Sequence, residues 1–208
     1  TVYDAQLPQV VCAPAQTINL SESGYADVPA HIFDGGSTDN CHHLYFKIRR
    51  MMASTALACQ DPLNPLNLFN DYARFCCADA DSSGILLVLR VYDVFPGEGV
   101  VSDTAGKGRY VDCMVTAIVR DKLAPSVECP PDHTVFCGTD ADDLFAGGSP
   151  LISDNCGIAT VDTAFLDLRD PCGGGEYRRT FTVTDRHGLV THCTQTLHYL
   201  RLHTFDGT

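Results

Sequence analysis

The sequence is poor in basic residues and contains no tryptophan. Its 14 Lys and Arg stand against 26 Asp and Glu, which gives a formal net charge of −12 at pH 7. This balance argues against binding to nucleic acid or to anionic membranes, because both reward clustered cations. No apolar run reaches the roughly 18 residues of a membrane-spanning helix, so membrane insertion is not expected. The absence of Trp weakens the case for sugar binding on stacked aromatic rings, although eight Tyr remain.

Signals of catalysis are also missing. The sequence has no Gly-x-Ser-x-Gly motif, which would place a nucleophilic serine on a sharp turn. Cys137 has no adjacent residue that would serve as its base. We therefore expect that the protein is not an enzyme, and we assign no catalytic residue and no certain cofactor.

Cysteine, in contrast, is abundant. The eleven cysteines are spread along the chain and are not arranged as the paired Cys-x-x-Cys knuckles of a zinc site. The only adjacent pair, Cys76 and Cys77, has a poor geometry for chelating one ion. We therefore predict a disulfide framework formed in an oxidising compartment, in a protein that is secreted or displayed on a cell surface. Apolar residues make up 45% of the chain, enough for a hydrophobic core.

The chain contains two copies of one pattern. Segments of the first half match segments of the second half in the same order: 4–14 with 121–131, 37–41 with 152–156, and 85–93 with 177–185. Such self-similarity is the signature of a repeated structural unit. We predict two domains, residues 1–121 and 122–208, with residues 1–8 as a linker or an exchanged strand.

The local patterns are those of β-strands. Phe181 and Val183 alternate with threonines, the period-two pattern of a half-buried strand. Residues 85–91 are apolar on both faces, as expected of a central strand that is covered on each side. Pro and Gly clusters separate short segments, and long amphipathic helix patterns are missing. These features predict an all-β fold made of two tandem immunoglobulin-like β-sandwiches.

The first copy is longer because of insertions near residues 51–77 and 95–108. The larger insertion carries Cys59 and one of the vicinal cysteines, and its residues 51–58 are compatible with a short helix. The smaller one is a glycine-rich loop. Because long loops on a rigid sandwich commonly carry binding, both are candidate binding loops. The alternative is that they are neutral decoration.

Several short motifs resemble one known family. They are Cys129-Pro130, Asp154-Asn155-Cys156, the strand 179–185 that reads Arg-Thr-Phe-Thr-Val-Thr-Asp, the segment 191–196 and the linker 121–125. Their order and spacing resemble the HYR-like immunoglobulin repeat. Such repeats occur in tandem in very large surface adhesins and gliding-motility proteins of the Bacteroidota. The resemblance implies a β-sandwich with an adhesive or structural role and no catalytic residues.

The same resemblance implies a disulfide pattern. A family cysteine is missing where this chain has His187, and its expected partner Cys137 would then be the unpaired thiol. The other ten would pair within each copy: Cys12–Cys113, Cys129–Cys193, Cys156–Cys172, Cys41 with Cys76 or Cys77, and Cys59 with the remaining vicinal cysteine. The first two pairs would join the first strand of each domain to its last.

Acidic residues at matching corners and strand ends of the two copies, and one on the linker, are candidate calcium ligands. They are Asp39, Asp93, Asp121, Asp154 and Asp185. Calcium prefers six to eight hard oxygen ligands, which gathered carboxylates supply. The alternative is that these side chains cap turns through their own backbone, since no tight Asp-x-Asp-x-Asp loop occurs. The nearest approach to such a loop, residues 79–81, is interpreted as a solvated turn.

Three residues are candidate glycosylation sites. Thr104 and Thr163 each lie in an Asp-Thr-Ala triplet, which fits the O-glycan acceptor pattern that the family resemblance implies. Asn19 begins an Asn-Leu-Ser sequon for N-glycosylation.

The start of the sequence matches the end of a domain. Residues 2–4 align with 119–121, the tail of the first closing strand, and no initiator Met or signal peptide precedes them. We therefore expect either a segment of a longer tandem array or a strand that completes a sheet in another copy. The second arrangement gives head-to-tail assembly into a filament.

The expected function is that of an extracellular structural or adhesive protein, with copies of itself as partners. Surface glycans or proteins are further candidate partners. One alternative is a carbohydrate- or protein-binding module that acts through the inserted loops of the first copy. Another is a non-catalytic appendage of a secreted hydrolase.

Overall fold

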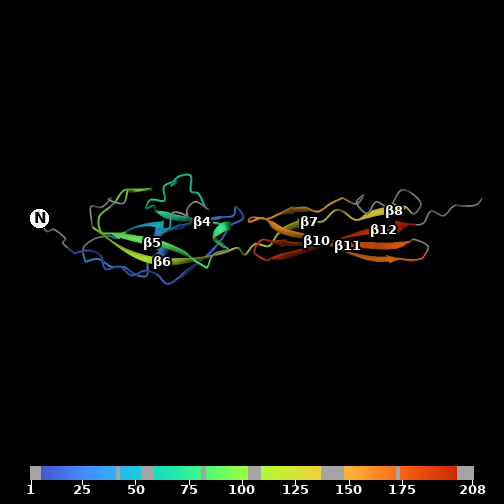
Figure 1. The fold of residues 1–208 in the computed structure, drawn as a ribbon, viewed down its shortest axis with the longest axis horizontal. Helices are drawn as coiled ribbons and strands as arrows, with labels where there is room; N and C mark the ends of the chain where they lie inside the picture. Colours follow the sequence, from blue (N-terminus) through green and yellow to red (C-terminus); the bar gives the residue numbers. More distant parts are fainter. Residues whose placement is uncertain are drawn as a thin grey trace, which may run out of the picture. The chain divides into compact units, whose positions relative to one another are not determined.

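The computed structural model describes residues 6–40, 43–52, 59–80, 83–102, 109–136, 148–171 and 174–200. The chain divides into two compact units, Thr1–Lys122 and Leu123–Thr208. The prediction of an all-β, immunoglobulin-like fold is confirmed (Figure 1). Within the described ranges, the helical elements are the short 3-10 helix η1 (Ala30–Phe33) and the single α-helical turn α2 (Cys77–Ala80). None of the helices in this part of the chain has the length and hydrophobicity to cross a membrane.

Unit 1 contains a four-stranded sheet and a two-stranded sheet. The larger sheet has the order β1 (Gln16–Asn19), β6 (Tyr110–Arg120), β5 (Ile85–Tyr92), β3 (Tyr45–Arg50). Strand β1 runs parallel to β6, and the other pairs are antiparallel. The smaller sheet pairs β2 (Tyr25–Pro29) with β4 (Tyr72–Cys76) in antiparallel register.

Strand β5 has the central position that its apolar sequence predicted. Leu87, Leu89 and Val91 are fully buried on one face. The other face is only partly covered, because the side chain of Leu86 remains 44% exposed. The expectation of full cover on both sides is therefore wrong at the start of this strand.

Arg90 of β5 is buried because aromatic rings enclose it. Its guanidinium carbon lies 3.9 Å from the ring centroid of Phe69 and 3.8 Å from that of Tyr110. Asp112 accepts two hydrogen bonds from this guanidinium, at 2.7 and 2.8 Å. Ring faces and a carboxylate together satisfy a cation in this position.

Unit 2 repeats the arrangement, with longer strands at the positions of β3 and β5 and a smaller second sheet. Its main sheet has the order β10 (Ile158–Arg169), β11 (Gly175–Asp185), β12 (Val190–Leu200), β8 (His133–Phe136). The second sheet pairs β7 (Ser126–Glu128) with β9 (Leu151–Ser153). In β11, Phe181 and Val183 are buried and the three threonines that alternate with them are half-buried, as the alternation predicted.

The two units share their strand pairings at matching positions. The bridge between Gln9 and Thr38 in unit 1 corresponds to the pair Ser126 and Ser153 in unit 2. The parallel strand pairs correspond as well. Strand β1 pairs with β6 from Gln16 and Ala117 onward, and β8 pairs with β12 from His133 and Leu197 onward. Strand β3 corresponds to the first half of β10 by its register on β5 and β11. The register of one unit therefore serves as a reference for the other.

The units differ in the path that the chain takes after β3 in unit 1 and after the first half of β10 in unit 2. In unit 1 the chain leaves β3 and returns through residues 59–76, which include β4, so the larger insertion supplies part of the second sheet. Within this insertion Asn70 forms two backbone hydrogen bonds with Ile48 of β3, at 2.8 and 2.9 Å. Phe69 and Phe75 fill the core beside it and are fully buried. In unit 2, β10 continues to Arg169 and turns back directly into β11.

Candidate functional site

Disulfides brace both units. Within the described ranges they join Cys12 to Cys113, Cys59 to Cys76 and Cys129 to Cys193. The first and third are the strand-to-strand pairs that the family resemblance implied, and the second resolves which vicinal cysteine bonds to Cys59. Cys77 and Cys156 are also disulfide-bonded. Cys41, Cys137 and Cys172 lie outside the described residues. This degree of cross-linking is typical of an oxidising compartment.

Asp79 is not part of a solvated turn, and that interpretation was wrong. Its side chain, in α2, is only 3% exposed and accepts hydrogen bonds from the Arg50 guanidinium at 2.8 and 2.6 Å. It also accepts one from the backbone N–H of Cys76 at 3.0 Å. Asp79 therefore anchors α2 to β3 and is a structural residue; Asp81 lies outside the described residues.

Three of the five candidate calcium ligands belong to unit 1. Asp93 is buried, and its two carboxylate oxygens both accept hydrogen bonds from Arg109. Asp39 is half-buried, and Asp121 is buried after the end of β6. The arginine already neutralises Asp93, which removes the main reason to place a metal ion there.

The other two candidates, Asp154 and Asp185, come together in unit 2. Asp154 comes directly after β9, and Asp185 is the last residue of β11. A carboxylate oxygen of one lies within 4.8 Å of a carboxylate oxygen of the other. In unit 1 the carboxylate of Asp93 is bound by an arginine, whereas in unit 2 the carboxylate of Asp185 lies beside that of Asp154.

Two of the three candidate glycosylation sites are described. Asn19 ends β1 and is exposed. Thr163 is exposed in the middle of β10. Thr104 lies outside the described residues.

Strand β10 has one open edge. Among the described residues it pairs with β11 alone, so its other edge presents backbone N–H and C=O groups without a strand partner. Such an edge is a template for pairing with another chain. Charged residues that would discourage pairing are sparse between Ile158 and Leu166, where Asp162 is the single one.

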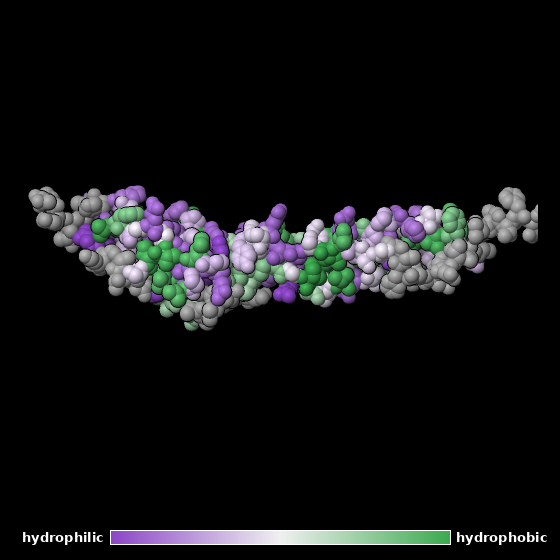
Figure 2. Space-filling model, turned by 90° about the horizontal axis from the view of Figure 1, so that it is seen from above, coloured by the Kyte–Doolittle hydropathy of each residue, from purple (hydrophilic) through white to green (hydrophobic). Residues whose placement is uncertain are grey.

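An apolar groove runs beside this edge. It has a volume of about 340 Å³ and is lined by Gly148, Ser149, Pro150, Ile152, Val161, Thr163, Phe165, Arg179 and Phe181. Phe165 and Val161 are 54% and 47% exposed, which is unusual for side chains on the inner face of a sandwich. Hydrophobic residues also gather into a patch on unit 2 in the space-filling view (Figure 2). The groove and the open edge together form what we call the β10 edge site.

One wall of the β10 edge site is a buried arginine. Arg179 of β11 donates hydrogen bonds to the side-chain oxygen of Gln195 and to the carbonyl oxygen of Gly148. Burial lowers the pKa of Arg179 from its ordinary value. Because these contacts are made within unit 2, the groove wall is held in place before any partner binds.

In unit 1, the insertion covers the surface that corresponds to the β10 edge site. By strand register, Thr163 corresponds to Ile48 and Phe165 to Arg50. Ile48 is fully buried and Arg50 nearly so, because the insertion packs over them. The β10 edge site is the surface that this insertion would cover in unit 2. Sequence reasoning missed it, although the shorter spacing between Cys156 and Asp185 was a usable signal.

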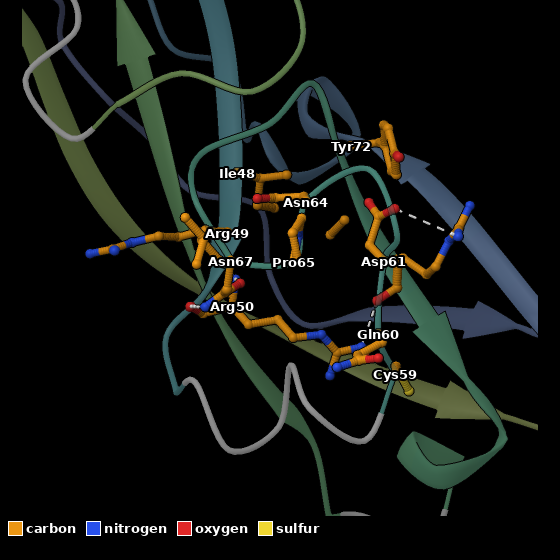
Figure 3. Close-up of a pocket in the computed structure, with 13 residues that line it drawn as sticks. Ile48, Arg49, Arg50, Cys59, Gln60, Asp61, Asn64, Pro65, Asn67 and Tyr72 are labelled. Atoms are coloured by element: carbon orange, nitrogen blue, oxygen red, sulfur yellow. Dashed lines mark hydrogen bonds and ion pairs between the residues drawn. The ribbon is translucent and has the colours of Figure 1, made fainter.

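The insertion of unit 1 also forms a pocket of about 130 Å³ between β3, the loop 59–67 and β4 (Figure 3). Arg74 pairs with Asp61 on one side, with 3.6 Å between the charged atoms. Burial and a hydrogen bond to Asp61 raise the pKa of Tyr72. Arg49 points away from the other labelled side chains.

The polar groups of this pocket mostly bind one another. The side-chain amide of Asn67 donates to the carbonyl of Arg50 at 2.9 Å and accepts from its N–H at 3.1 Å. Arg74 also forms two hydrogen bonds with Asp27, at 2.7 and 2.6 Å. The pocket is therefore small and internally satisfied, and it lies in the insertion that the sequence indicated as a binding loop.

No protein-family model matches the chain, and no curated protein matches it. Similar solved structures include Drosophila N-cadherin EC1-4, with 12% identity over 94% of this chain and 50% of that one, and a TM-score of 0.35. Protocadherin Gamma C5 EC1-3 has 12% identity over 92% of this chain and 68% of that one, with a TM-score of 0.31. Mouse clustered PcdhgC3 EC1-3 has 12% identity over 93% and 68%, with a TM-score of 0.26. The chain thus spans half the length of the N-cadherin structure, and scores this low carry no inference about function.

Proposed function

We propose that the chain is an extracellular structural or adhesive module that assembles with copies of itself through the β10 edge site. In this assembly an extended segment of one copy lies along β10 of the next and inserts apolar side chains into the groove. The observation that carries the proposal is the combination of an open strand edge with an apolar groove beside it. Adding a strand to such an edge is a common mode of protein association.

Pro8 is buried and Gln9 pairs with Thr38 in unit 1, so the donor that we assign is residues 1–5 of another copy. Residues 2–4 match the tail of a closing strand in the repeat, and so they have the sequence of a β-strand. Five extended residues span about 17 Å, less than half the length of a twelve-residue strand such as β10. The edge is therefore long enough to receive this segment.

Two further features support an extracellular role. The disulfides require an oxidising environment to persist. The resemblance to HYR-like repeats of Bacteroidota adhesins and gliding-motility proteins, which we propose as the family, points to tandem surface modules.

Assembly is tested by light scattering and negative-stain electron microscopy of the purified chain over a range of concentrations. We expect head-to-tail oligomers or filaments. The variant Phe165→Lys places a charge in the groove and should leave monomers. The matched control is Val190→Lys, because Val190 is 45% exposed and lies in β12, away from the open edge of β10.

The donor segment is tested separately by deletion of residues 1–5. The deletion should abolish assembly as completely as Phe165→Lys does. Assembly that survives the deletion but not Phe165→Lys would refute the assigned donor. A native chain that remains monomeric at high concentration would refute the proposed function.

A second candidate function is ligand binding by the insertion of unit 1, which the pocket in Figure 3 favours. The pocket has the size of a small molecule, and Tyr72 and Asp61, which are hydrogen-bonded to each other, lie at its wall. Screening the native chain against a glycan array and then testing Tyr72→Phe would examine this function. Loss of a specific signal in the variant would support it, and the absence of any signal would count against it.

A further inference from the structure

We propose that Asp154 and Asp185 form a binding site for a divalent cation, calcium, within unit 2. The site lies where the turn after β9 meets the turn between β11 and β12. It narrows the set of acidic candidates from the sequence to two residues, and it is independent of the proposed assembly.

Both carboxylates are held by backbone hydrogen bonds through one oxygen. Oδ2 of Asp154 accepts the N–H groups of Cys156 and Gly157, at 2.8 and 2.7 Å. Oδ1 of Asp185 accepts the N–H groups of His187 and Leu189, both at 2.8 Å. These contacts fix the position of each carboxylate and leave its second oxygen for another partner.

The second oxygens are buried, and none of the described residues donates a hydrogen bond to them. They are Oδ1 of Asp154 and Oδ2 of Asp185, and the whole of Asp185 is only 1% exposed. A buried charged oxygen without a partner is costly, and two carboxylates with oxygens within 4.8 Å also repel each other. A bound cation removes both costs at once.

The basic residue that follows Asp185 in sequence does not neutralise the pair. Arg186 comes directly after Asp185, but its side chain is exposed and its guanidinium lies beside Gly157. Within the described part of unit 2 it forms no ion pair with either carboxylate. Cys156 is disulfide-bonded, so its sulfur is not available as a metal ligand.

Unit 1 shows how the same position is satisfied without a metal. Asp93 corresponds to Asp185, and Arg109 neutralises both of its oxygens. The position of Arg109, just before β6, is occupied in unit 2 by Leu189, just before β12. Unit 2 therefore keeps the buried carboxylate without the arginine, and Asp154 stands at the position that Asp39 has in unit 1.

The donor set favours a hard cation. Two carboxylates supply negative oxygen ligands, and calcium accepts such ligands in flexible geometry with water completing its shell. Magnesium requires a stricter octahedral arrangement and should bind more weakly.

The test is calorimetric titration of the chelator-treated full chain with calcium chloride and, separately, with magnesium chloride. We expect one calcium site with a Kd of about 0.1–1 mM, the range of extracellular calcium modules, and a rise in Tm when calcium is added. Asp185→Asn should weaken binding at least tenfold, because the amide keeps the backbone contacts but not the charge. Asp93→Asn is the matched control and should retain native affinity.

Asp154→Asn provides a second variant in case Asp185→Asn does not fold, and it should weaken binding to a similar extent. Near-ultraviolet circular dichroism establishes that each variant is folded. The proposal is refuted if the native chain shows neither binding heat nor a Tm change. It is refuted equally if a folded Asp154→Asn or Asp185→Asn variant binds calcium as the native chain does.

Discussion

Arg50 and Asp79 form a buried, two-pronged ion pair that joins strand β3 to helix α2, with 5% and 3% of their side chains exposed. The pair lies on the surface that the insertion of unit 1 covers. The Arg50 guanidinium also lies 5.3 Å from the ring centroid of Phe75. The insertion is therefore held by charge as well as by apolar packing.

Asp79→Ala should destabilise unit 1 by about 3–5 kcal/mol, because it leaves the Arg50 guanidinium buried without a counter-ion. The measurement is urea unfolding with the disulfides intact. Asp27→Ala is the control, because its ion pair with Arg74 is partly exposed to solvent and should contribute less than about 1 kcal/mol. Equal losses in the two variants would contradict the structural role of Asp79.

Gly175→Ala should destabilise the hairpin of β10 and β11 by about 1–3 kcal/mol, since it combines backbone strain with a clash. Gly175 has a φ of +132°, and an added Cβ would lie 2.7 Å from the carbonyl oxygen of Leu168. Gly188→Ala, at a φ of +84° with open space around it, should cost only about 1 kcal/mol. Thermal unfolding compares the two, and a larger loss at Gly188 would disprove the packing account.

Tyr92 should give unit 1 a stability that declines at alkaline pH. Burial raises the pKa of this tyrosine above its ordinary value of 10.0, so folding favours the protonated phenol. Its contribution is complete below pH 10 and is lost as the pH rises from there through the pKa of the folded state. Absorbance at alkaline pH should show delayed ionisation that disappears in Tyr92→Phe; an unchanged titration curve would argue against it.

Thr163 should be unmodified in assembled material. Its side chain lines the groove of the β10 edge site, and a glycan at this position would occupy the space that we assign to the inserted strand. Peptide mass mapping of oligomers and monomers, separated by size, measures this directly. A glycan on Thr163 in the oligomers would exclude the proposed geometry.

The regular parts of the fold could be predicted because their signal is local. The alternation around Phe181 and the apolar run 85–91 depend only on neighbouring residues and on whether each face is buried. The position of Leu86 could not be derived in this way, since its exposure depends on how far the second sheet extends over β5.

The sites depend on contacts that sequence spacing does not encode. Arg50 and Asp79 are separated by an insertion, and nothing in either segment indicates that they meet. The same holds for the difference between Asp93 and Asp185, which arises from a single arginine just before the neighbouring strand. The openness of β10 results from a missing segment. The shorter spacing from Cys156 to Asp185 indicates that residues are missing, but the strand that they would cover is identified by comparing the two repeats in three dimensions.

The bonds from Cys12 to Cys113 and from Cys129 to Cys193 have a mechanical consequence. They enclose sequence separations of 101 and 64 residues. A pulling force applied to the two ends of the chain passes through the sulfur atoms and bypasses the strands that lie between them. The module would then transmit tension with little lengthening, and reducing agents would convert a stiff tether into an extensible one.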